Sequence, residues 1–108
     1  MKQEMVIEIL ANALPDLKSR YPIHHIELFG SVARNTDSEH SDIDLLVDVD
    51  PEIGLAIVDL SDELEQLLGT PVDLITTRGI NPRLKKRIKR ELIPVSYTHL
   101  TLPTILLV

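Results

Sequence analysis

Apolar residues recur at helical spacing in two segments of the chain. In the first, between residues 2 and 18, they are Val6, Ile9, Leu10, Ala13, Leu14 and Leu17. In the second, between residues 52 and 68, they are Ile57, Leu60, Leu64, Leu67 and Leu68. This spacing places each set on one face of a helix. Tyr21-Pro22 ends the first helix, because the residue before a proline avoids the α region, and Gly69 follows the second as a C-terminal cap.

Three shorter segments read as strands. Ile26 to Phe29 is stopped by Gly30, Ile43 to Val49 is stopped by Asp50-Pro51, and Pro71 to Thr76 follows Gly69 closely. Asn81-Pro82 resembles a helix N-cap with proline at the first helical position, and it opens a basic helix that reaches about Leu92. The order of helix, strand, strand, helix, strand and helix predicts one α/β domain.

Composition and charge narrow the classes of function. The chain has 108 residues, of which 44% are hydrophobic and 3% aromatic, so we expect a single aliphatic core. It has no cysteine, which agrees with a cytoplasmic protein, and it has no apolar run long enough for a leader or a membrane span. The formal charge of −6 argues against general nucleic-acid binding. Basic residues gather between residues 83 and 90, which we interpret as a solvated helix face.

The last segment differs in style from the rest of the chain. From Val95 it reads VSYTHLTLPTILLV, and VSYTHL is also what one frame of a common transposon-derived sequencing adapter translates to. We therefore divide the chain into a domain at residues 1–94 and a tail at residues 95–108 that we interpret as a cloning artefact. The alternative is a hydrophobic C-terminal strand or an interface tail.

Two carboxylates interrupt an otherwise apolar strand. Asp42 and Asp44 are two residues apart, so both side chains point to the same face and repel each other unless a cation lies between them. Oxygen ligands at this spacing suit Mg²⁺, which keeps several waters and is shared with substrate phosphates. Asp73 is the only acid in the third strand and completes a candidate two-metal site.

A phosphate-binding loop precedes these acids. Gly30 follows a strand and allows the backbone to approach a ligand, while backbone N–H groups of a short helix and the Ser31 hydroxyl donate to phosphate. Arg34 lies three residues further on and can pair with a phosphate oxygen. A triphosphate between this loop and metal-bound carboxylates is a coherent arrangement.

Gly30-Ser31, ten residues and Asp42-Ile43-Asp44 resemble the signature of the polymerase-β-like nucleotidyltransferase superfamily. The opening G-S-x-A-R and the continuation S-D-I-D-L-L-V are similar to its smallest branch, the minimal nucleotidyltransferases (MNT), over about residues 20–92. The resemblance implies a palm with a small mixed sheet flanked by helices. It also implies that Asp42, Asp44 and Asp73 bind Mg²⁺, with Asp73 activating the acceptor, and that Gly30, Ser31 and Arg34 hold the triphosphate of ATP.

Minimal members of this superfamily are similar to the antitoxins of HEPN–MNT pairs. The resemblance implies transfer of AMP from ATP to a tyrosine of a partner HEPN toxin, within a homo- or hetero-oligomer. Two alternatives stay open: a non-catalytic nucleotide-binding module that neutralises its partner by contact, and transfer to a small molecule such as an aminoglycoside.

Four further polar residues receive no site role from the sequence. We expect surface or turn positions for Asp48 and Asp50, and we expect no metal-binding role for His24 and His25.

Overall fold

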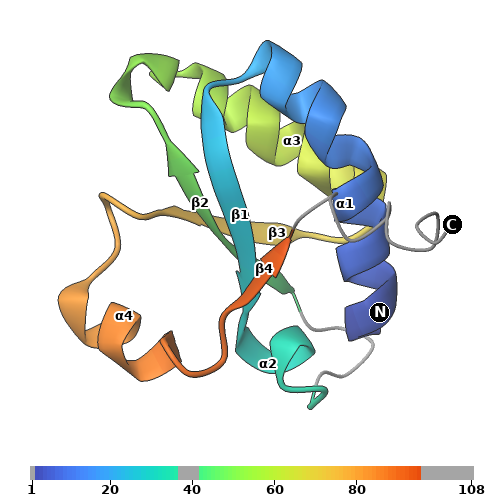
Figure 1. Cartoon of the computed structure of the whole chain (residues 1–108), viewed down its shortest axis with the longest axis vertical. Coiled ribbons are helices and arrows are strands. Elements are labelled where there is room, and N and C mark those ends of the chain that lie inside the picture. The colour runs from blue at the N-terminus through green and yellow to red at the C-terminus, as the bar shows by residue number, and fades with distance from the viewer. Residues whose placement is uncertain (1, 37–41, 96–108) are drawn as a thin grey trace, which may run out of the picture.

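The computed structural model describes residues 2–36 and 42–95 (Figure 1). These residues alternate between helices and short strands. In chain order the elements are α1 (Gln3–Arg20), β1 (Ile23–Phe29), α2 (Gly30–Ala33), β2 (Ile43–Val49), the 3₁₀ turn η1 (Pro51–Ile53), α3 (Ala56–Leu68), β3 (Val72–Thr76), α4 (Pro82–Ile88) and β4 (Ile93–Val95).

The four strands form one mixed sheet in the order β3-β2-β1-β4. β1 pairs antiparallel with both β2 and β4, whereas β2 and β3 are parallel and therefore need the crossover that α3 provides. The register places Phe29 opposite Asp44 across one boundary and Asp44 beside Asp73 across the next. The predicted α/β class with a small mixed sheet flanked by helices is confirmed.

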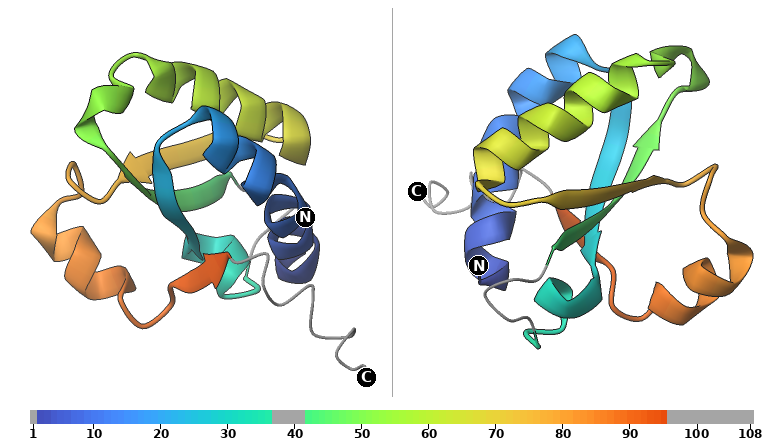
Figure 2. Two further views of the ribbon diagram at one scale, coloured as in Figure 1. Left: turned by 45° about the horizontal axis from the view of Figure 1, so that its top comes forward. Right: turned by 180° about the vertical axis from the view of Figure 1, so that it is seen from behind.

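Helices cover both faces of this sheet. α1 and α3 lie side by side on one face (Figure 2). Most of their periodic apolar residues are buried or half-buried there, and Leu10 and Leu64 are fully enclosed. α4 lies away from these two helices and packs Ile88 against Phe29 and Leu46 on the other face. The strands of a sheet covered on both sides read as continuous apolar runs, which explains the strongly hydrophobic IDLLVDV of β2.

Two sequence predictions about the C-terminal part are wrong. The helix predicted to reach about Leu92 ends at Ile88, and residues 93–95 form a strand that the sequence did not reveal. Pro94 has no N–H group to continue a helix and keeps Ile93 out of the α region, while the edge of β1 offers hydrogen-bond partners. Pairing with β1 therefore overrides the helical pattern.

β1 also begins three residues earlier than predicted, at Ile23 instead of Ile26. The two exposed histidines at its start hide the strand pattern, because they break the alternation of apolar and polar side chains.

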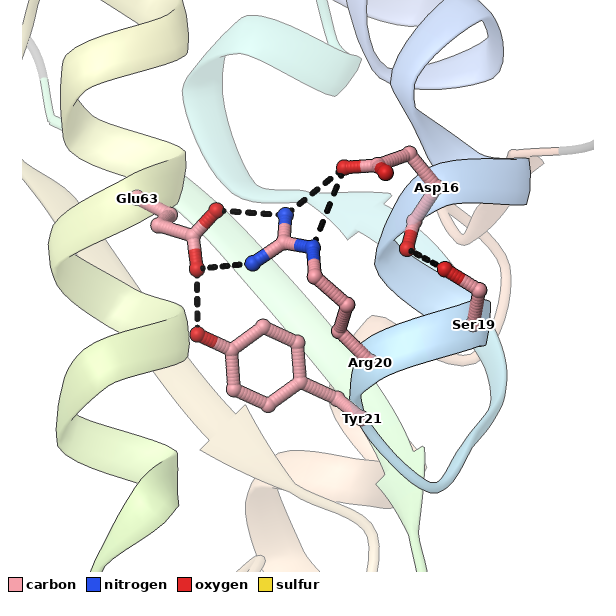
Figure 3. Close-up of polar contacts among 5 residues, drawn as sticks. All are labelled: Asp16, Ser19, Arg20, Tyr21 and Glu63. Carbon is pink, nitrogen blue, oxygen red and sulfur yellow. Dashed lines mark hydrogen bonds and ion pairs between the residues drawn. The ribbon is translucent and has the colours of Figure 1, made fainter.

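A polar cluster ties the end of α1 to α3 (Figure 3). Arg20 donates two hydrogen bonds to the carboxylate of Glu63, at 2.8 and 2.7 Å, and others to Asp16, while the Tyr21 hydroxyl donates to Glu63. These bonds hold the pKa of Glu63 down to about 2, mainly through Arg20. The cluster fixes the two helices that cover one face of the sheet.

The predicted tail lies almost entirely outside the described residues. Only Val95 is described, and it is a buried residue of β4 opposite Ile26. The division between residues 94 and 95 stays a prediction. Among the described helices, none is both long and apolar enough to cross a bilayer.

Candidate active site

A pocket of about 420 Å³ lies where β1 ends and where β2 and β3 begin. It brings together five of the six residues predicted as site residues, from three separate parts of the chain: Gly30, Ser31, Arg34, Asp44 and Asp73. The parallel pairing of β2 with β3 places the two acids side by side, and the antiparallel pairing of β1 with β2 places the glycine loop beside them. The sheet register therefore assembles the pocket.

Gly30 is required by the position of Asp44. Its φ of +80° lies in the left-handed region that favours glycine, and a Cβ atom there would stand 2.0 Å from Asp44 Oδ2. No side chain fits in that space unless the carboxylate moves. The loop backbone thus approaches the strand carboxylate closely enough for one ligand to contact both.

The carboxylates of the pocket carry unfavourable charge. Burial raises the pKa of Asp44, and the negative charges of Asp73 and Asp42 raise it further. Asp42 lies just before β2, exposed and outside the wall of the pocket. A cation at this position would relieve the repulsion.

The chemistry of these donors fits a divalent cation that is completed by substrate. Across residues 2–36 and 42–95, no three carboxylate or imidazole side chains are close enough to hold a metal ion by themselves. Mg²⁺ is commonly bound through one or two carboxylates together with waters and substrate phosphates. Asp44 and Asp73, with Asp42 at the rim, can supply such a share of the ligands.

The predicted phosphate-binding loop binds an anion of the protein itself. The Gly30 N–H group donates a hydrogen bond to Glu91 Oε2 at 2.6 Å. Arg34 Nη1 donates to both oxygens of the same carboxylate, at 2.9 and 3.1 Å. Two of the three residues predicted to hold phosphate, Gly30 and Arg34, therefore converge on one point, and a carboxylate occupies it.

The sequence prediction missed the wall that α4 and the turn after it contribute. Leu84, Arg87, Ile88 and Glu91 all line the pocket. Their spacing of three, four and seven residues is that of one helix face, so the pattern could have placed them together. The sequence assigns Arg87 to a solvated basic helix face. In the structure Arg87 is exposed, but it also lines the pocket.

The four residues without a predicted site role lie away from this pocket. Asp48 accepts a hydrogen bond from the Thr77 hydroxyl at 3.1 Å, and His24 Nε2 lies 2.7 Å from Asp50 Oδ1. The hydrogen bond to Asp50 raises the pKa of His24. His25 lies 3.8 Å from Asp48.

Comparison with known proteins identifies the family. Residues 10–95 match the nucleotidyltransferase domain family. A candidate protein adenylyltransferase of Methanocaldococcus jannaschii is 44% identical over 88 residues, which cover 80% of this chain and 90% of that protein. The protein adenylyltransferase MntA of Thermococcus cleftensis is 34% identical over 94 residues, which cover 85% of this chain and 94% of MntA.

Solved structures agree with this assignment. A structure described as a candidate minimal nucleotidyltransferase superposes with a TM-score of 0.73 at 38% identity, covering 87% of this chain and 96% of the other. A toxin–antitoxin complex with AMP-PNP has a TM-score of 0.64 at 22% identity and covers 96% of this chain and 93% of its own. A tri-AMPylated Shewanella oneidensis HEPN toxin with its MNT antitoxin has a TM-score of 0.63 at 21% identity, covering 94% and 92%. At such identities the two complexes support the fold alone.

The chain belongs to the nucleotidyltransferase domain family and, within the polymerase-β-like superfamily, to the minimal nucleotidyltransferases. It is thus a nucleotidyltransferase enzyme, and adenylyl transfer is the activity for which its relatives are named.

Proposed function

We propose that this protein transfers AMP from ATP, with Mg²⁺, to a tyrosine hydroxyl of a partner HEPN toxin and thereby acts as its antitoxin. The observation that carries the proposal is the meeting of Asp44 and Asp73 with Gly30 and Arg34 in one pocket. Carboxylates for a cation and donors for an anion, side by side, suit a metal-bound triphosphate.

The residues would divide the work as follows. The Gly30 N–H group, the Ser31 hydroxyl and Arg34 bind the triphosphate and orient its α-phosphorus. Asp42, Asp44 and Asp73 would hold Mg²⁺, which would lower the pKa of the acceptor hydroxyl and stabilise the leaving oxygen. The acceptor oxygen forms a bond to the α-phosphorus, the bond from that phosphorus to the bridging oxygen breaks, and pyrophosphate leaves. Asp73 receives the hydroxyl proton.

A protein acceptor is favoured over a small molecule by two considerations. Two relatives that align over most of their length with this chain are named for protein adenylyl transfer, MntA among them. Toxin–antitoxin complexes share the fold, and one contains an AMPylated HEPN toxin. A cytoplasmic location fits the use of ATP as substrate.

The test is transfer of label from α-labelled ATP, with Mg²⁺, to a HEPN-type toxin encoded beside this gene. Asp44→Asn should reduce the transfer rate by about 100-fold or more, because a ligand of the Mg²⁺ that would stabilise the transition state is lost. Asp48→Asn is the matched control: it removes a carboxylate four residues along the same strand, outside the pocket wall, and should leave the rate unchanged.

Two outcomes would reject the proposal. If the toxin stays unlabelled while the double variant Asp42→Asn plus Asp44→Asn still neutralises it, the protein is a binding module. If label passes to an aminoglycoside in the absence of any partner protein, the acceptor is a small molecule.

A further inference from the structure

Glu91 lies in the turn between α4 and β4, far along the chain from the loop that it contacts. Its carboxylate accepts a hydrogen bond from the Gly30 N–H group and two from Arg34, across 61 and 57 residues of sequence. The side chain is only 17% exposed, whereas that of Arg34 is 52% exposed. The Glu91 carboxylate is therefore largely buried in the pocket wall. We call its position against Gly30 and Arg34 the seat of Glu91.

This seat is an unfavourable place for a purely structural carboxylate. Three carboxylates, those of Asp44, Asp73 and Glu91, line the pocket with two guanidinium groups, those of Arg34 and Arg87. The negative charges of Asp73, Asp42 and Glu91 all oppose the ionisation of Asp44. Glu91 thus adds a negative charge to a site already rich in them, and Arg34 with the Gly30 N–H group offsets it.

Glu65 provides an instructive contrast. Its carboxylate also accepts a hydrogen bond from a backbone N–H group, that of Val72, at 2.9 Å. That bond joins α3 to the start of β3 and lies outside the pocket wall. The same chemistry is structural at Glu65, whereas at Glu91 it uses the donors that a phosphate needs.

We propose that Glu91 is an internal substitute for a substrate phosphate, which ATP must displace before it can bind productively. The inference rests on the proposed function, since it concerns the regulation of the same site. The turn from Lys89 to Leu92 then acts as a gate. In the closed state the Glu91 carboxylate is in its seat and occupies the donors of Arg34 and Gly30. In the open state the carboxylate has withdrawn, and both donors are available to the triphosphate.

The fold confines the movement that opening requires. On one side of the turn, Ile88 is buried against the sheet, and on the other, Ile93 pairs with Leu28 of β1. Only the turn and the Glu91 side chain need to move. Arg87, one helical turn earlier in the same wall, remains in place to face the incoming phosphates.

The gate lowers apparent affinity by the fraction of molecules in which it is open, because the observed Kd equals the intrinsic Kd divided by that fraction. Glu91→Gln keeps the size of the side chain and removes its charge, so it weakens the closed state without leaving a hole. We therefore expect the variant to bind nucleotide more tightly than the wild type.

The experiment measures binding of AMP-PNP with Mg²⁺ by isothermal titration calorimetry on the whole chain. Glu91→Gln should lower the Kd by about fivefold or more, since the hydrogen bonds that Arg34 and the Gly30 N–H group donate would then go to a neutral amide oxygen instead of a carboxylate. Glu91→Ala should lower it further. Glu65→Gln, the matched control, should leave the Kd unchanged. Thermal unfolding of each variant establishes that it is folded.

A second measurement follows the contact between Glu91 and the Gly30 N–H group directly. The amide resonance of Gly30 should shift in Glu91→Gln without any ligand, and in the wild type on addition of inorganic triphosphate. A Kd that is equal in wild type and Glu91→Gln overturns the gate and leaves the proposed function standing. Weaker binding by the variant also overturns it, because Glu91 would then assist the nucleotide. Failure of every variant to bind nucleotide rejects the proposed function and the gate together.

Discussion

Replacing Gly30 by alanine tests whether close approach of the loop to Asp44 is the basis of the site. Gly30 and Gly69 both have positive φ, at +80° and +69°. At Gly69 an added Cβ meets nothing within 4 Å, whereas at Gly30 it would lie 2.0 Å from Asp44 Oδ2. An alanine at either position would therefore carry the same kind of backbone strain, but only at position 30 would its methyl group also collide with another side chain.

The magnitudes follow from these contacts. Gly69→Ala should cost about 1 kcal/mol of unfolding free energy from the left-handed backbone alone. Gly30→Ala should cost about 2 kcal/mol, because the carboxylate is also displaced. Ordinary van der Waals contact begins near 3.4 Å, and the added Cβ would lie 2.0 Å from Asp44 Oδ2. The Asp44 carboxylate must therefore move away by about 1.4 Å. Misplacement of a reacting group by about 1 Å lowers a rate by about 100-fold.

Urea unfolding measures the stability of both variants, and transfer of labelled AMP to the toxin measures their activity. We expect Gly30→Ala to lose activity by about 100-fold and Gly69→Ala to keep wild-type activity. An active Gly30→Ala variant would show that Asp44 tolerates displacement. Equal loss of activity in both variants would trace the effect to stability instead of geometry.

Three other predictions concern the rest of the fold. Glu63→Gln should lower the unfolding temperature at neutral pH, and the difference should shrink as pH falls from about 4.3 toward the pKa of about 2 that Arg20 imposes on Glu63. His24→Gln should reduce the unfolding temperature below about pH 6.5, where His24 is charged in both states, and the difference should fade as pH rises through the raised pKa of His24. Leu10→Ala, at a fully buried position, should cost about 3 kcal/mol in urea unfolding and leave the Kd for AMP-PNP unchanged.

Local patterns in the sequence were sufficient for most of the elements. Most of the periodic residues of α1 and α3 are buried or half-buried, because a helix can satisfy its own backbone and needs only one apolar face. Leu67 is the exception, with 42% of its surface exposed. Asn81 caps α4 as predicted, accepting a hydrogen bond from the Arg83 N–H group at 2.8 Å. β4 escaped prediction because its three residues become a strand only through the free edge of β1.

The sequence by itself determined the class of the fold and the nucleotidyltransferase family, and it predicted the chemical type of the site. The spacing between Gly30-Ser31 and the pair Asp42 and Asp44 predicts a phosphate and metal chemistry, since residue type and interval carry that information.

Only the tertiary structure decided which groups meet. The sheet register brings Asp73 beside Asp44 and the Gly30 backbone against it, and no local pattern encodes a register between strands. The same holds for Glu91, whose partners lie 57 and 61 residues away. An acid in a basic segment reads as a surface charge until the fold places it beside Gly30 and Arg34, the donors that we propose for phosphate.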